Sequence, residues 1–118
     1  MEFLPMSNIL ECLPDSVRIV EAEGVKAGEA WLITQDQQPA LAVCDAFACA
    51  AKPDGDPTNP PKQRGAFKTM CVGDLSVYQA WATRTLREQK PQRLLPAHGG
   101  SSQADTLWQD LTRLVEEL

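Results

Sequence analysis

Hydrophobic positions in the first half of the chain recur at short intervals and predict β-strands. Residues 16–23 ("SVRIVEAE") alternate loosely between apolar and polar side chains, while residues 28–34 ("GEAWLIT") and 40–45 ("ALAVCD") are short apolar runs. Glycines or polar residues separate the three runs, as is typical of strands joined by turns. The sequence therefore predicts three strands in close succession, connected as an antiparallel meander.

A proline-rich segment, residues 51–65, interrupts this pattern. It contains four prolines and two glycines and almost no apolar side chain. Proline lacks the backbone N–H that helices and interior strands require. Because long loops in small domains are usually functional or disordered, and because no catalytic arrangement is visible here, we interpret residues 51–65 as a flexible loop.

The second half of the chain has helical periodicity on both sides of one short strand. Asp74 is a favourable N-terminal capping residue and Pro91 ends the helix that follows it. Residues 93–97 ("RLLPA") predict a strand, and Ser102 with Asp105 resembles a capping box that would begin a final helix. The apolar positions that recur at helical spacing, and are predicted to be core, are Leu75, Tyr78, Trp81, Ala82, Leu86, Leu107, Trp108, Leu111, Leu114, Val115 and Leu118.

Composition narrows the classes of protein to consider. The 118 residues suit one domain, and a net charge of −5 with no basic cluster argues against nucleic-acid binding. No apolar run approaches the roughly 20 residues that span a bilayer, and residues 1–10 lack the features of a secretory signal. We therefore expect a cytoplasmic protein that binds neither nucleic acid nor membranes.

The four cysteines do not form a recognisable metal or disulfide pattern. Cys12, Cys44, Cys49 and Cys71 include no CxxC pair, which zinc ribbons and fingers require. Disulfides are also unexpected in the cytoplasm. Most of these cysteines are predicted to be buried, reduced thiols.

The order of elements and two short motifs resemble the C-terminal half of the metallo-β-lactamase fold superfamily. The stretch "LLPAHGG", which contains His98, is similar to the family's L-P-G-H-G motif, and "LAVCDAF" places Asp45 where the family has a metal-bridging aspartate. The resemblance covers residues 16–118. It implies an α/β fold that is half of an αββα sandwich, with about four strands of mixed or antiparallel sheet and two helices on one face.

The sequence departs from the family at most of the metal ligands. When Gly24 and Gly28 are aligned with the glycines of the family's G-H-T-x-G motif, Val25 takes the place of the histidine. Since His98 is the only histidine, the H-x-H-x-D-H motif is also missing. Asp45 and His98 remain as a vestigial or weak metal site, for which zinc, iron or manganese are the candidate ions. A hydrolytic site needs about three protein ligands, so we expect no cofactor and no catalytic residues in the lone chain.

A half-sandwich would leave one face of its sheet uncovered, and exposed apolar faces usually mark an interface. We expect a homodimer or a partner protein that carries the N-terminal half, with residues 1–15 as an alternative lid over this face. Three functions remain open. They are a non-catalytic domain that acts by association, a metal-dependent hydrolase whose site is completed across a dimer or by a partner chain, and a small-molecule binder that uses a cleft beneath residues 51–65.

Overall fold

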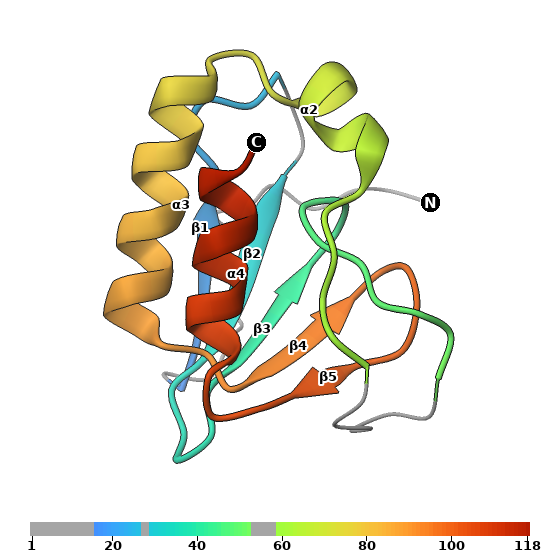
Figure 1. Ribbon diagram of the computed structural model, residues 1–118. Helices are drawn as coiled ribbons and strands as arrows, with labels where there is room; N and C mark the ends of the chain where they lie inside the picture. The colour runs from blue at the N-terminus through green and yellow to red at the C-terminus, as the bar shows by residue number, and fades with distance from the viewer. Residues whose placement is uncertain (1–15, 27–28, 53–58) are drawn as a thin grey trace, which may run out of the picture.

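Five strands form one mixed sheet in the computed structural model, which describes residues 16–26, 29–52 and 59–118 (Figure 1). The strands lie in chain order across the sheet. Neighbouring strands are antiparallel except for β3 and β4, which are parallel. Their bounds are β1 Val17–Glu21, β2 Ala30–Thr34, β3 Ala40–Val43, β4 Arg93–Pro96 and β5 Ser102–Gln103. The predicted meander of the first three strands is confirmed.

Two helices, α3 (Leu75–Gln89) and α4 (Leu107–Glu116), lie side by side on one face of the sheet, and a short helix, α2 (Gly65–Cys71), precedes them (Figure 1). The predicted limits of α3 are confirmed. The Asp74 side chain accepts a hydrogen bond from the Val77 N–H (3.2 Å), and Lys90 ends the helix in the left-handed conformation, immediately before Pro91. None of the described helices is both long enough and apolar enough to cross a membrane.

The core lies between this face of the sheet and the two long helices. The Trp31 ring of β2 is completely buried and lies 4.5 Å from the Trp81 ring of α3, measured between centroids. The prediction that Trp81 is a core residue is therefore confirmed, whereas Trp108 is only half-buried, with the Lys90 ammonium 5.8 Å from the centre of its ring. Other buried residues that close this core are Ile33, Leu41, Val43, Tyr78, Leu86, Leu94, Leu107, Leu111 and Val115.

The opposite face of the sheet carries an apolar row. Cross-strand pairing aligns Ile19 with Leu32, Leu32 with Ala42, and Ala42 with Leu95. Because side chains alternate along a strand, this row lies on the face opposite Ile33, away from α3 and α4 (Figure 1). The Leu95 side chain is 47% exposed. We call these four residues the open-face row; the proposed lid, residues 1–15, lies outside the described residues.

The predicted start of the last helix is wrong. Ser102 does not cap a helix but belongs to β5, where it is buried opposite Leu94, and α4 begins five residues later. Its N-cap is Thr106, whose side chain makes no capping hydrogen bond. Helix α2 and strand β5 are not predicted from the sequence, so the sheet has five strands instead of about four, and the described chain has three helices instead of two.

Candidate functional site

Asp45 and His98 meet at one edge of the sheet. Asp45 follows β3 and His98 follows β4, and these two strands are parallel neighbours, so the chain leaves both strands at the same edge. The Nε2 atom of His98 lies 3.1 Å from Oδ1 of Asp45. The structure therefore brings together the two residues that the sequence marked as a vestigial metal site, although they are 53 positions apart in the chain.

Close backbone packing holds the turn that carries His98. The Cys49 N–H donates to the His98 carbonyl (3.1 Å), and the Gly100 N–H donates to the Ala50 carbonyl (2.9 Å). Gly99 has φ = +91°, and a Cβ atom at this position would lie 1.7 Å from the Cys49 carbonyl oxygen. A glycine is needed after His98 because no side chain fits there.

Arg64 is the third member of the site, and it is not predicted from the sequence. Its Nη1 donates to Oδ1 of Asp45 at 2.5 Å, so one carboxylate oxygen contacts both the guanidinium and His98. The segment before Arg64 runs alongside the residues that come after β3. Lys62 and Ala48 exchange two backbone hydrogen bonds, and the Gln63 side chain donates to the Ala46 carbonyl (2.6 Å). This end of the proline-rich segment is thus hydrogen-bonded to the site.

Glu29, just before β2, is hydrogen-bonded to the turn that follows β3. Its side chain is buried, and its Oε2 accepts a hydrogen bond from the Asp45 N–H (3.2 Å). Burial raises the pKa of Glu29, and hydrogen bonds from the backbone of residues 44–46 oppose that rise. Its other oxygen, Oε1, has no hydrogen-bond partner among the residues that the structure describes.

Cys44 differs from the prediction of buried thiols, because it is exposed, whereas Cys49 is buried and Cys71 half-buried. None of these three forms a disulfide, and Cys12 lies outside the described residues. The pKa of the Cys44 thiol is raised by desolvation and then by the negative charges of Asp45 and Glu29. Because the thiolate is the nucleophilic form of cysteine, these surroundings do not favour Cys44 as a catalytic residue.

Glu29, Cys44 and Asp45 nevertheless form a possible ligand cluster. One donor atom from each residue lies within 4.8 Å of the others, and His98 contacts the Asp45 carboxylate. Carboxylate, thiolate and imidazole are the groups that Zn²⁺ prefers, so the donor chemistry fits this ion. The arrangement does not include Val25, whose half-buried side chain packs against the core. Gly28 lies outside the described residues.

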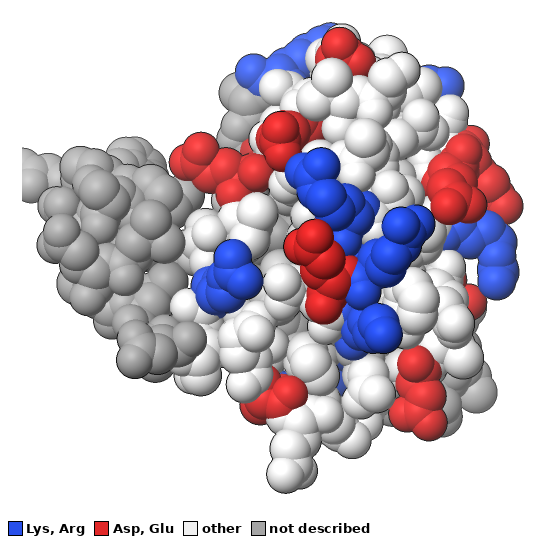
Figure 2. Space-filling model, turned by 90° about the vertical axis from the view of Figure 1, so that its left-hand side faces the viewer, with Lys and Arg blue, Asp and Glu red and all other residues white. Residues whose placement is uncertain are grey.

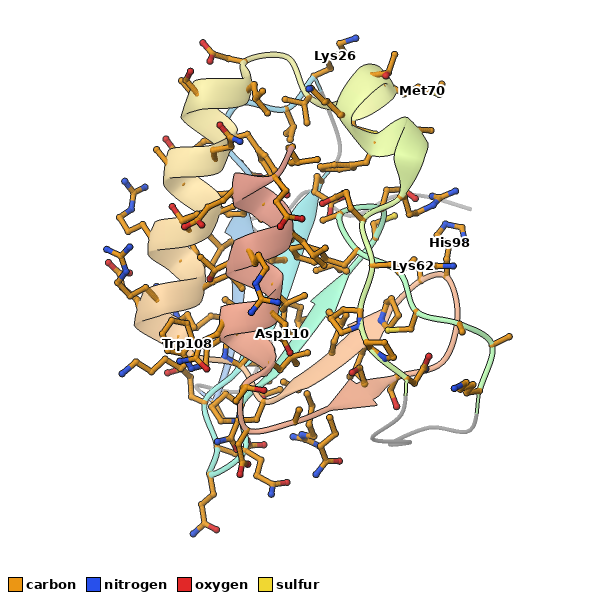
Figure 3. The ribbon with its side chains drawn as sticks, viewed as in Figure 1. Lys26, Lys62, Met70, His98, Trp108 and Asp110 are labelled. Carbon is orange, nitrogen blue, oxygen red and sulfur yellow. The ribbon has the colours of Figure 1, made fainter. Side chains whose placement is uncertain are left out.

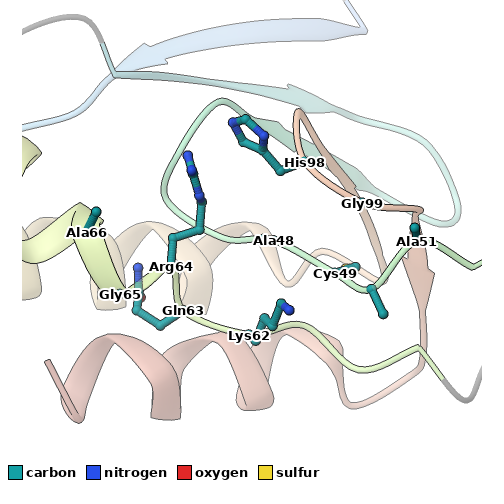
Figure 4. A pocket seen from close by; sticks show the side chains of 11 residues that line it. Ala48, Cys49, Ala51, Lys62, Gln63, Arg64, Gly65, Ala66, His98 and Gly99 are labelled. Carbon is teal, nitrogen blue, oxygen red and sulfur yellow. The ribbon is translucent and has the colours of Figure 1, made fainter.

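A cavity of about 520 Å³ opens beside the site, lined by residues 48–51, 62–66 and 98–99 (Figure 4). Lys62, Arg64 and His98 are the lining residues with basic side chains, and no lining residue is acidic. Figure 3 shows Lys62 and His98 on the side of the molecule away from α3, and in the close-up of Figure 4 the segment that carries Ala48 and Cys49 passes between them. Residue 51 and residues 62–65, from the two described ends of the proline-rich segment, form part of its lining.

Comparison of the chain with protein-family models, with curated proteins and with solved structures found no match.

Proposed function

We propose that this chain is a non-catalytic, degenerate domain of the metallo-β-lactamase type that acts by association with a second copy of itself. The observation that carries the proposal is the contact between Arg64 and Asp45. A guanidinium stays charged throughout the physiological pH range and pairs well with carboxylates. Arg64 therefore gives Asp45 the positive charge that a metal ion would otherwise supply.

The same contact opposes metal binding at Asp45. A unit charge 4 Å from the guanidinium costs on the order of 4 kcal/mol in an effective dielectric of 20, and a divalent ion costs twice that. Solvent reduces this cost, because the Arg64 and Asp45 side chains are 37% and 36% exposed. A metal that binds Oδ1 of Asp45 would have to displace Arg64 from the oxygen that Arg64 shares with His98.

The open-face row supports association. Its four side chains are apolar and contiguous through cross-strand pairs, and both long helices lie on the other face. By contrast, Figure 2 shows that acidic and basic side chains are interspersed on the side of the molecule that α3 forms. Since desolvating charged groups is costly, the open face of the sheet is better suited to a stable interface than the charged side formed by α3. A second copy offers the same apolar row, which gives a twofold, self-complementary contact.

Sedimentation velocity tests this association with a matched pair of variants. Leu95 (47% exposed) belongs to the open-face row, and Val77 (43% exposed) lies on α3. We expect a dimer for the wild type and for Val77→Arg but a monomer for Leu95→Arg, because the charge would be buried at the interface. A monomeric wild type, or a Leu95→Arg variant that remains dimeric, would contradict the proposal.

A metal-dependent hydrolase is the second candidate, and the ligand cluster favours it. Glu29 brings a buried carboxylate with one unpartnered oxygen to within 4.8 Å of donor atoms on Cys44 and Asp45. Together with His98 these residues would hold a divalent ion, which would activate a water molecule or polarise a substrate carbonyl. The site would then need no ligand from a partner chain.

Titration with Co²⁺ distinguishes the two candidates, because thiolate ligation gives an intense charge-transfer absorption. The non-catalytic function predicts no saturable band for the wild-type protein. Because Arg64→Met removes the competing guanidinium, this variant should bind Co²⁺ more tightly than the wild type. A stoichiometric band that disappears in Cys44→Ser but persists in Cys71→Ser would instead support the metal site and overturn the first candidate.

A further inference from the structure

We propose that the cavity beside Asp45 binds a small molecule through an oxyanion group, a phosphate or a carboxylate, with Lys62 and Arg64 as the anchoring residues. This inference goes beyond self-association, because the cavity and the open-face row are separate surfaces. It rests on how firmly the cavity walls are held, on their charge and on their size.

Hydrogen bonds fix the walls of the cavity to one another. Asn59 is completely buried, and its amide joins two segments. Its Oδ1 accepts from the Ala50 N–H (3.0 Å), while its Nδ2 donates to the carbonyls of Ala50 and Ser101 (3.1 Å each). The segment of residues 48–50 is held at two further points. Ala48 exchanges backbone hydrogen bonds with Lys62, and Cys49 packs closely against Gly99. A cavity held in this way exists before a ligand arrives, which reduces the entropic cost of binding.

The charge of the cavity is opposite to that of the chain. The whole chain has a net charge of −5, yet the lining contains two permanent cations and an imidazole, with no acidic residue. Asp45, which is not among the lining residues, contacts Arg64 and His98 but not Lys62. Within the parts of the chain that the structure describes, no carboxylate forms an ion pair with Lys62. The ammonium lies close enough to the buried Cys49 thiol to oppose the rise in pKa that burial causes there.

The size and shape of the cavity indicate the class of ligand. A volume of about 520 Å³ lies within the range of small-molecule sites. Figure 4 shows the Arg64 side chain extending from the segment that also carries Lys62 toward His98. Nη1 of the Arg64 guanidinium contacts Asp45, so its Nε–H and Nη2–H groups remain to pair with two oxygens of one oxyanion, and Lys62 adds a flexible point charge elsewhere on the cavity wall. Ala48, Cys49 and Ala66 provide a small apolar surface for the rest of the molecule.

Isothermal titration calorimetry with inorganic phosphate and with succinate, at constant ionic strength in sodium chloride, tests this proposal. We expect saturable binding of at least one of the two anions, weakened at least tenfold in Lys62→Met. The matched control is Lys68→Met, which removes an exposed lysine on α2 outside the cavity and should change binding less than twofold. The preferred anion identifies the source as a phosphorylated or a carboxylated molecule.

Three outcomes would overturn the proposal. They are the absence of saturable binding by both anions, equal weakening in Lys62→Met and Lys68→Met, and unchanged affinity in Lys62→Met. Lys62 is exposed, so its replacement should leave the fold intact, which the circular dichroism spectrum verifies. Repeating the titration with Leu95→Arg separates this proposal from self-association, because binding should persist in a monomer.

Discussion

Replacing Gly99 with alanine should unfold the turn that carries His98. The added Cβ would lie 1.7 Å from the Cys49 carbonyl oxygen, and alanine at φ = +91° is itself strained. The strain costs about 1–2 kcal/mol. Relieving the collision would break the hydrogen bonds Cys49 N–H to His98 O and Gly100 N–H to Ala50 O, each worth about 1 kcal/mol. The free energy of unfolding should therefore fall by about 3–4 kcal/mol.

Urea denaturation followed by tryptophan fluorescence measures this loss. The control is Gly65→Ala in α2, where a Cβ would meet nothing within 4 Å and where alanine favours the helix. This variant should be neutral or up to about 1 kcal/mol more stable. A Gly99→Ala protein within about 1 kcal/mol of the wild type would refute the argument that this turn is close-packed.

Three further predictions concern single side chains. Asp74→Ala should lower the free energy of unfolding by about 1 kcal/mol in urea denaturation, because it removes the cap on the Val77 N–H; full stability of the variant would contradict this role. Because the pKa of Glu29 is raised, the folded chain retains a proton that the unfolded chain releases, so the Glu29 contribution to stability should fall as pH rises above its ordinary pKa of 4.5. Urea titrations at several pH values should show that this fall disappears in Glu29→Gln. Iodoacetamide should alkylate Cys44 faster in Asp45→Asn, which removes a charge that raises the pKa of the thiol; an equal or slower rate would refute that cause.

Patterns of local sequence were sufficient for most of the fold. Alternation located β1, short apolar runs located β2 and β3, and a capping residue with a following proline located α3, because each signal lies within or next to the element that it specifies. The capping-box interpretation of Ser102 failed because pairing with Leu94 across the sheet buries that residue. Such a contact depends on a partner distant in sequence, which the local pattern does not contain.

The same limit explains what was missed at the candidate site. Asp45 and His98 were found because each ends a predicted strand in a motif that resembles a known family. Arg64 lies in a polar, proline-rich segment, where a charged residue normally faces solvent, and its partner is 19 positions away. Glu29 precedes a strand, and nothing in its neighbourhood indicates burial. Both residues acquire their roles only when the chain after β3 packs between them.

The single parallel pairing in the sheet has a consequence for the folding kinetics. β1 to β3 can form early as local hairpins, but β4 must wait until α2 and α3 have brought the chain back to β3. Contacts between residues this distant in sequence form slowly, because the intervening loop must close first. The contact between Asp45 and His98 depends on that step. A folding intermediate that has only the first three strands would therefore lack the contact between Asp45 and His98.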